Sequence, residues 1–203
     1  MQDWNEIKAW RMSTRRQLLE ARAALPAPQR RALGHRITEH LLAAFAPLPA
    51  DCIGFYWPIR GEFDLRPAVR QWCAGSVQAA LPVVVARDAA MIFRPWHPGT
   101  AMTTGIWNIP IPATEETISP SVLLVPLVGF DDHGYRLGYG GGFYDRTLAG
   151  MRTAPLTIGI GLAASRVASV HPQTHDMPLT AILTEEGWAR PLPPDEPRRR
   201  ASG

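Results

Sequence analysis

Short apolar runs alternate along this chain with longer segments whose apolar residues recur at helical spacing. The run from Val122 to Val128 is unbroken and is bounded by Ser, Pro and Gly, which is typical of a buried strand. Leu33, Ile37 and Leu41 recur instead every fourth residue, which predicts one apolar face of a helix. The same criteria predict strands at 52–57, 77–85, 91–95, 122–128, 156–160 and 180–184. They predict helices at 3–24, 28–45, 65–74 and 143–149, with prolines or glycines at their ends.

This alternation of strands and helices predicts an α/β fold in which helices cover both faces of a mostly parallel sheet. In such sheets, ligands bind beyond the carboxyl ends of the strands. The loops at 58–64, 129–142 and 162–178 all leave predicted strands at that end. We therefore expect these loops to converge on one cleft.

The length of 203 residues fits one domain, with the 46% apolar and 19% charged residues of an ordinary globular protein. We place that domain at residues 1–188 and expect the proline-rich, basic segment 189–203 to be disordered. No apolar run approaches the ~20 residues of a membrane span, and the first residues lack a signal-peptide core, so we expect a cytoplasmic protein without a membrane partner. Cys52 and Cys73 are too few for a disulfide framework.

A glycine-rich segment at 138–142 lies between a predicted strand and a predicted helix. Its glycines are Gly138, Gly140, Gly141 and Gly142. Glycine allows positive φ angles and has no Cβ to keep an anion away, and the N–H groups at a helix start attract phosphate. A flexible linker is the alternative, but Arg136, Phe143 and Tyr144 flank the segment, and such bulky side chains are unusual in linkers. We expect a phosphate site.

Carboxylates follow several of the predicted strands. Asp145 lies on the first turn of the helix after the glycines, where it could hold a divalent cation that bridges phosphates. Asp176 lies in a proline-flanked, irregular loop and could share Mg²⁺ with Asp145. The same prolines argue against His171 and His175 as ligands of a transition metal. Glu62 is either a solvated loop acid or an acceptor for N–H groups of a substrate.

Arg11, Arg15 and Arg22 share one face of the first predicted helix. This face is either a solvated basic stripe or a set of guanidiniums that contacts an anionic ligand. A third interpretation is a protein that binds nucleic acid through this helix. The net charge of +3 favours that interpretation only weakly, because arginines of the segment 189–203 contribute to it.

Residues 159–164 match the G-x-G-x-x-A fingerprint of dinucleotide-binding folds, so a dinucleotide-dependent oxidoreductase is a further alternative. A long helix should begin near Gly161 in such a site, yet His171 and Pro172 follow within about two turns. The end of a core strand fits these residues better.

Residues 136–145, RLGYGGGFYD, resemble the R-x-G-x-G-x-G-Y-Y-D signature of the 5-formyltetrahydrofolate cyclo-ligases, also called methenyltetrahydrofolate synthetases. Four further motifs stand in the order of that family: a basic pair, a strand-end acid, a W-N-I segment and a late H-D-M-P. In this chain they are Arg11 with Arg15, Glu62, residues 107–109 and residues 175–178. The likeness covers about residues 8–186.

The resemblance implies a single-domain, three-layer α/β fold. It also implies an enzyme that uses ATP and Mg²⁺ to convert 5-formyltetrahydrofolate into 5,10-methenyltetrahydrofolate, with phosphoryl activation of the formyl oxygen and release of ADP and phosphate. The implied nucleotide contacts are Arg11, Arg15, Arg136, Gly138, Gly140, Gly141, Gly142, Phe143 and Tyr144. The implied Mg²⁺ ligands are Asp145 and Asp176, and the implied contacts of the reduced folate, possibly polyglutamylated, are Trp57, Glu62, Trp107 and Tyr144. Arg15, Tyr144 and Asp145 are the expected catalytic residues of a monomer or weak homodimer that does not bind nucleic acid.

Overall fold

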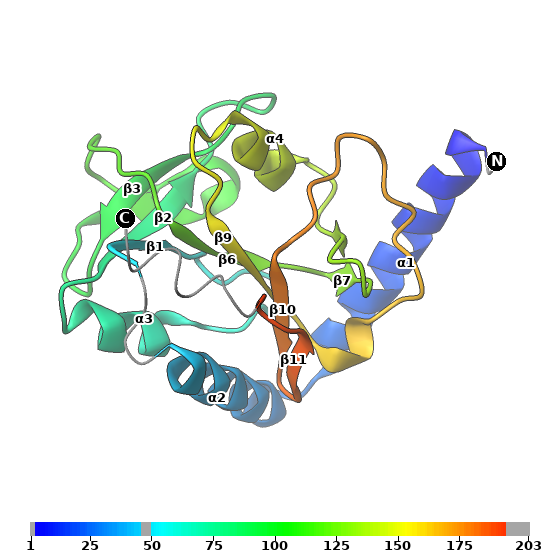
Figure 1. Cartoon of the computed structure of the whole chain (residues 1–203), viewed down its shortest axis with the longest axis horizontal. Coiled ribbons are helices and arrows are strands. Elements are labelled where there is room, and N and C mark those ends of the chain that lie inside the picture. The colour runs from blue at the N-terminus through cyan, green and yellow to red at the C-terminus, as the bar shows by residue number, and fades with distance from the viewer. Residues whose placement is uncertain (1–2, 46–49, 194–203) are drawn as a thin grey trace.

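A seven-stranded sheet forms the centre of the protein (Figure 1). The structure is a computed structural model that describes residues 3–45 and 50–193. The strands lie in the order β11 (Gly187–Arg190), β10 (Ala181–Thr184), β9 (Leu156–Ile160), β6 (Val122–Pro126), β1 (Cys52–Gly54), β2 (Gln78–Val83) and β3 (Ile92–Trp96). Neighbouring strands from β10 to β2 are parallel, and β11 and β3 are antiparallel edge strands. The predicted mostly parallel sheet is confirmed.

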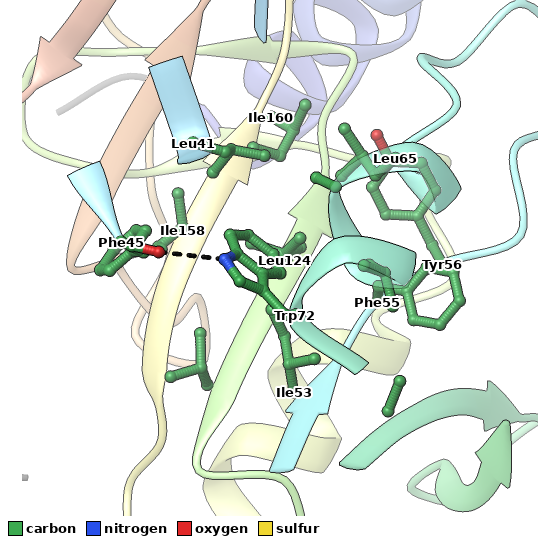
Figure 2. Packing of buried hydrophobic residues seen from close by; sticks show 14 of the residues in the cluster. Leu41, Phe45, Ile53, Phe55, Tyr56, Leu65, Trp72, Leu124, Ile158 and Ile160 are labelled. Carbon is green, nitrogen blue, oxygen red and sulfur yellow. Dashed lines mark hydrogen bonds between the residues drawn. The ribbon is translucent and has the colours of Figure 1, made fainter. Parts of the chain in front are cut away.

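Helices cover both faces of this sheet. The helices are α1 (Trp4–Ala24), α2 (Ala27–Ala44), α3 (Arg66–Cys73) and α4 (Phe143–Gly150). Figure 2 shows side chains of α2 and α3 packed on one face, where Trp72 donates a hydrogen bond to the Phe45 carbonyl at 3.0 Å. Leu148 of α4 packs on the other face. Along β6, Leu124 belongs to the first of these clusters and Leu123 to the second, because successive strand residues point to opposite faces. The three-layer α/β prediction is therefore confirmed.

The α1 helix lies across the end of the sheet where β6 leaves it, beside the short strand β7 (Gly129–Phe130) (Figure 1). Leu18 of α1 packs against Gly129 so closely that a Cβ added there would lie 2.7 Å from the leucine. Arg22 donates a hydrogen bond to the Leu127 carbonyl. The first helix therefore borders the loops that follow the central strands.

Several short elements lie outside the main sheet. They are β4 (Met102–Thr104), β5 (Pro110–Pro112), β8 (Arg136–Leu137) and the 3₁₀ turns η1 (Ile106–Asn108) and η2 (Ala163–Ser165). The strands pair as β4 with β5 and as β7 with β8. The sequence does not predict them, because two or three residues are too short to show a period.

The sheet continues past the predicted domain end at residue 188. Residues 187–190 form β11, which pairs with β10 and extends the sheet into the segment expected to be disordered. Trp188 anchors this strand, since its ring lies 6.3 Å from that of Phe45 in an edge-on contact. The remainder of that segment, from residue 194 on, lies outside the described residues.

The predicted strands at 52–57 and 122–128 are longer than the observed β1 and β6. Phe55, Tyr56, Leu127 and Val128 continue the apolar runs, and all four are buried, but they lie beyond the paired parts of β1 and β6. An apolar run predicts which residues are buried, not which are paired in a sheet, and here the buried residues continue into the loops. No helix among the described residues is long and apolar enough to cross a membrane.

Candidate active site at the carboxyl edge of the sheet

The glycine loop, residues 138–142, joins β8 to α4. Gly140 and Gly142 have φ angles of +90° and +64°, which side-chain-bearing residues rarely adopt. A Cβ on Gly141 would lie 2.5 Å from the Phe143 ring. Gly138 has open space around it, and its carbonyl accepts a hydrogen bond from Arg15. Three of the four glycines are thus required by backbone conformation or by close packing.

The backbone donors of this loop are available to a ligand. In the described part of the chain, the N–H groups of residues 139–142 donate no hydrogen bond. They precede α4, whose N-terminal end carries partial positive charge. A Cβ on Gly140 would lie 3.7 Å from the guanidinium carbon of Arg15. Free N–H donors beside a guanidinium are suited to an anion such as phosphate.

The arginine face of α1 turns toward these loops. Arg11 donates to the Val170 carbonyl at 2.9 Å and to the Asp176 carboxylate, and Arg15 donates to Gly138. Arg22 donates to the Tyr139 hydroxyl at 2.6 Å and is only 6% exposed. Burial, followed by the nearby charge of Arg11, lowers the pKa of Arg15. These contacts tie the arginines to the loops at the carboxyl edge of the sheet and rule out a solvated stripe.

Asp145 is held in place by two donors. Its Oδ1 accepts hydrogen bonds from Arg136 at 2.9 Å and from the Met177 N–H at 3.0 Å. Arg136 also donates to the Met177 carbonyl, and its side chain is 5% exposed. The guanidinium of Arg136, which the resemblance assigns to phosphate, is therefore engaged with the carboxylate of Asp145.

Asp176 lies at the same edge of the sheet, because the residue after it is the one that contacts Asp145. Its Oδ2 accepts from Arg11 and from the Gln173 N–H at 2.8 Å, and its Oδ1 lies 3.9 Å from His175 Nε2. The structure thus places the loop of Asp176 beside Asp145, through the hydrogen bond from Met177. The His171 ring packs edge-on against Trp10 of α1, with the ring centres 4.7 Å apart.

These carboxylates suit a Mg²⁺ ion that also binds phosphates. Asp145 Oδ2 and Asp176 Oδ1 accept no hydrogen bond from any other described residue. Over the same part of the chain, no group of three or more His, Cys, Asp or Glu could hold a metal alone. Mg²⁺ usually takes one or two carboxylates and completes its shell with phosphates and water. The pair fits that pattern.

Glu62 is fixed in the loop after β1 and is not a solvated acid. Its Oε2 accepts from the Ile59 N–H at 2.9 Å, and its Oε1 accepts from the Tyr139 hydroxyl at 2.8 Å. Burial raises the pKa of Glu62, whereas these two hydrogen bonds and the charges of Arg22 and Arg60 oppose that rise. The pKa of the Tyr144 hydroxyl is raised, first by burial and then by the charge of Glu62. The charge of Glu62 therefore acts on Tyr144 across the site.

The two tryptophans differ in their surroundings. Trp107 has a φ angle of +57°, is 54% exposed, and lies with its ring 5.5 Å from that of Phe143. The Trp57 ring faces the Arg66 guanidinium at 4.6 Å. Trp107 thus borders the glycine loop, whereas Trp57 is tied to the start of α3.

Sequence reasoning did not assign Arg22 or Tyr139 to the site. The signal for Arg22 was its place on the same helical face as Arg11 and Arg15. Tyr139 stood between glycines as one of several aromatics, and nothing in the sequence indicates its hydrogen bond to a residue 77 positions away.

The dinucleotide-binding hypothesis is wrong. No long helix follows β9; the next element is η2, three residues long. Cβ atoms on Gly159 and Gly161 would lie 2.6 Å and 2.1 Å from the Leu127 side chain. These glycines are therefore needed for close packing of the strand against its neighbours.

A Gly161→Ala variant should accordingly lose stability. The added methyl overlaps Leu127, and overpacking of this kind typically reduces the free energy of unfolding by about 1–3 kcal/mol. Urea denaturation measures the change. Gly150→Ala, whose Cβ meets no atom within 4 Å, is the control and should lose no stability.

Fold and site together define a three-layer α/β protein whose glycine loop, arginines and carboxylates converge at the carboxyl edge of one sheet. A model of the 5-formyltetrahydrofolate cyclo-ligase family matches residues 7–185. This chain belongs to that family and is an enzyme of the ligase class, as the sequence motifs predict.

Similar proteins agree with this assignment. The 5-formyltetrahydrofolate cyclo-ligase of Escherichia coli K12 is 30% identical over 175 residues, which cover 81% of this chain and 94% of that protein. The enzyme of the same name from Haemophilus influenzae is 29% identical over 85% of this chain and 96% of its own length. The solved 5,10-methenyltetrahydrofolate synthetase of Aquifex aeolicus has a TM-score of 0.76 at 26% identity, over 89% of this chain and 92% of that one.

Proposed function

We propose that this enzyme converts 5-formyltetrahydrofolate into 5,10-methenyltetrahydrofolate with ATP and Mg²⁺, releasing ADP and phosphate. The observation that carries the proposal is the glycine loop. Its N–H groups at 139–142 have no partner in the described residues and lie beside Arg15 and Asp145, in a chain that belongs to the cyclo-ligase family. Such an arrangement supports phosphate binding next to a metal-binding carboxylate.

The nucleotide and the folate occupy adjoining parts of this edge. Arg15 and the glycine loop hold the phosphates, Arg11 adds a second positive charge from its place beside Asp176, and Arg136 orients Asp145. Glu62 accepts hydrogen bonds from N–H groups of the pterin ring, and Tyr144 lies next to it. Trp107 covers the loop through its contact with Phe143 and offers an aromatic face to the folate. Trp57, in the loop after β1 and beside Arg66, is the remaining expected contact of the folate.

The reaction needs positioning and charge neutralisation more than a protein nucleophile. The formyl oxygen attacks the γ-phosphorus of ATP, and the bond from that phosphorus to ADP breaks. N10 then attacks the formyl carbon and loses its proton, and the carbon–oxygen bond breaks to release phosphate. Mg²⁺ held by Asp145 and Asp176 would supply neutralising charge to the phosphates. Arg15 adds a positive charge beside the loop.

The proposal is tested by following methenyl product optically after 5-formyltetrahydrofolate is mixed with the full chain. We expect product only when both ATP and Mg²⁺ are present, with one ADP released per product molecule. Product that forms at the same rate without ATP, or none under any condition, would contradict it.

An Arg15→Ala variant should weaken ATP binding by about tenfold or more, because a charge-assisted contact with phosphate is lost. Arg31→Ala removes the same charge from an exposed position on α2 and is the matched control. Titration of both variants with ATP and Mg²⁺ measures the effect. Equal losses in both would indicate a general electrostatic field instead of a contact.

A further inference from the structure

Tyr139 links the glycine loop to the loop that carries Glu62. Its hydroxyl donates a hydrogen bond to Glu62 Oε1 at 2.8 Å and accepts one from Arg22 at 2.6 Å. The second oxygen of Glu62 accepts from the Ile59 N–H. The carboxylate is therefore oriented from two sides, by its own loop and by the glycine loop.

The tyrosine side chain is held by cationic neighbours. Arg22 is 6% exposed, and its Nε has no hydrogen-bond partner among the residues that the structure describes. Arg22 and Glu62 both line a cavity of about 10 Å³. The guanidinium of Arg60 lies 5.5 Å from the centre of the Tyr139 ring. The hydroxyl thus lies among partly buried protein groups.

The backbone of Tyr139, in contrast, belongs to the segment whose N–H groups make no hydrogen bond within the described chain. A ligand that binds these N–H groups acts on the same five residues that place the Tyr139 hydroxyl. Two flanking glycines leave this backbone free to adjust. The two halves of the site therefore meet at one residue.

We propose that Tyr139, held by Arg22, is a positioning residue that couples nucleotide binding at the glycine loop to folate binding at Glu62. This inference rests on the function proposed above. Phosphates that order residues 138–142 also fix the hydroxyl on Glu62, which then accepts hydrogen bonds from the folate in a set orientation. Because coupling between two binding sites is reciprocal, bound folate tightens nucleotide binding by the same factor.

The test is calorimetric titration of the full chain with 5-formyltetrahydrofolate, with and without Mg²⁺ and a non-hydrolysable ATP analogue. The ratio of the two dissociation constants is the coupling factor. We expect a factor of about 10 in the wild type and a factor near 1 in Tyr139→Phe, which lacks only the hydroxyl. Titration with the analogue, with and without folate, should give the same factors. Tyr135→Phe loses the same atom, and Tyr135 contacts Asp131 through its backbone, so it should keep the wild-type factor.

A pH series provides a second readout. Glu62 faces Tyr139, Arg22, Arg60, Tyr56 and Tyr144. The hydrogen bond from Tyr139 lowers the pKa of Glu62 against the effect of burial, so removing the hydroxyl raises that pKa further. As the pH falls, folate binding to Tyr139→Phe should weaken at a higher pH than in the wild type. If Tyr139 acted only in folding, folate binding would weaken at the same pH in the variant and in the wild type.

The outcomes separate the two proposals. If the wild type binds both ligands but shows no coupling, or if Tyr139→Phe keeps the wild-type factor, the coupling role is overturned and the proposed function stands. If the wild type binds neither ligand, both are overturned.

Discussion

An Asp145→Asn variant is expected to form the methenyl product at least about 100-fold more slowly than the wild type. The substitution keeps the size of the side chain and one acceptor oxygen for Arg136 and Met177, but it removes the negative charge. We propose that this charge helps to hold Mg²⁺, and a neutral amide is a much weaker ligand for that ion. Product formation across a Mg²⁺ titration measures the loss, which added Mg²⁺ should restore only in part.

The same variant also loses the ion pair with Arg136, whose side chain is 5% exposed. We expect a reduction of about 1–3 kcal/mol in the free energy of unfolding, which urea denaturation separates from the loss of activity. Asp132→Asn removes the same charge from an exposed pair with Arg166 and is the control. Full activity of Asp145→Asn, or equal losses in the two variants, would contradict the assigned role.

A Gly140→Val variant should lose ATP affinity by about tenfold or more. Gly140 has a φ angle of +90°, which a β-branched residue tolerates poorly, so the loop must change its conformation. The added side chain would also point toward the Arg15 guanidinium, whose central carbon lies 3.7 Å from the new Cβ. Both effects disturb the N–H groups proposed to bind phosphate. Titration with ATP and Mg²⁺ gives the affinity.

Gly150→Val is the matched control for this substitution. Gly150 ends α4 and has open space where a Cβ would stand. A thermal unfolding curve for each variant shows whether the fold persists. A folded Gly140→Val protein that binds ATP as the wild type does would remove the glycine loop from the nucleotide site.

The sequence predicts the main layers because they depend on local periodicity. The helical spacing of Ile37 and Leu41 and the unbroken run from Val122 place α2 and β6 close to their observed bounds. The carboxyl-edge rule for parallel sheets then predicts that the loops with Glu62, Asp145 and Asp176 converge. Two hydrogen bonds confirm this convergence. Tyr139 of the glycine loop donates to Glu62, and Met177, next to Asp176, donates to Asp145.

The hydrogen-bond partners of the site's side chains could not be predicted in this way. Arg11 and Arg136 are each paired with a carboxylate, and Arg22 binds the Tyr139 hydroxyl 117 positions away. Such pairs depend on tertiary distances, and a motif records only residue types and spacing. The strand β11 was also not predicted, because the proline-rich segment that follows dominates the composition around Trp188.

We propose that the formyl oxygen receives the γ-phosphoryl group in a site built from the glycine loop and its carboxylates. The most direct test of this proposal uses 5-formyltetrahydrofolate labelled with ¹⁸O in the formyl group, turned over by the full chain with ATP and Mg²⁺. We expect each released phosphate to carry the label and ADP to carry none, as mass spectrometry of the products would show. Unlabelled phosphate formed together with the methenyl product would contradict phosphoryl transfer to the formyl oxygen.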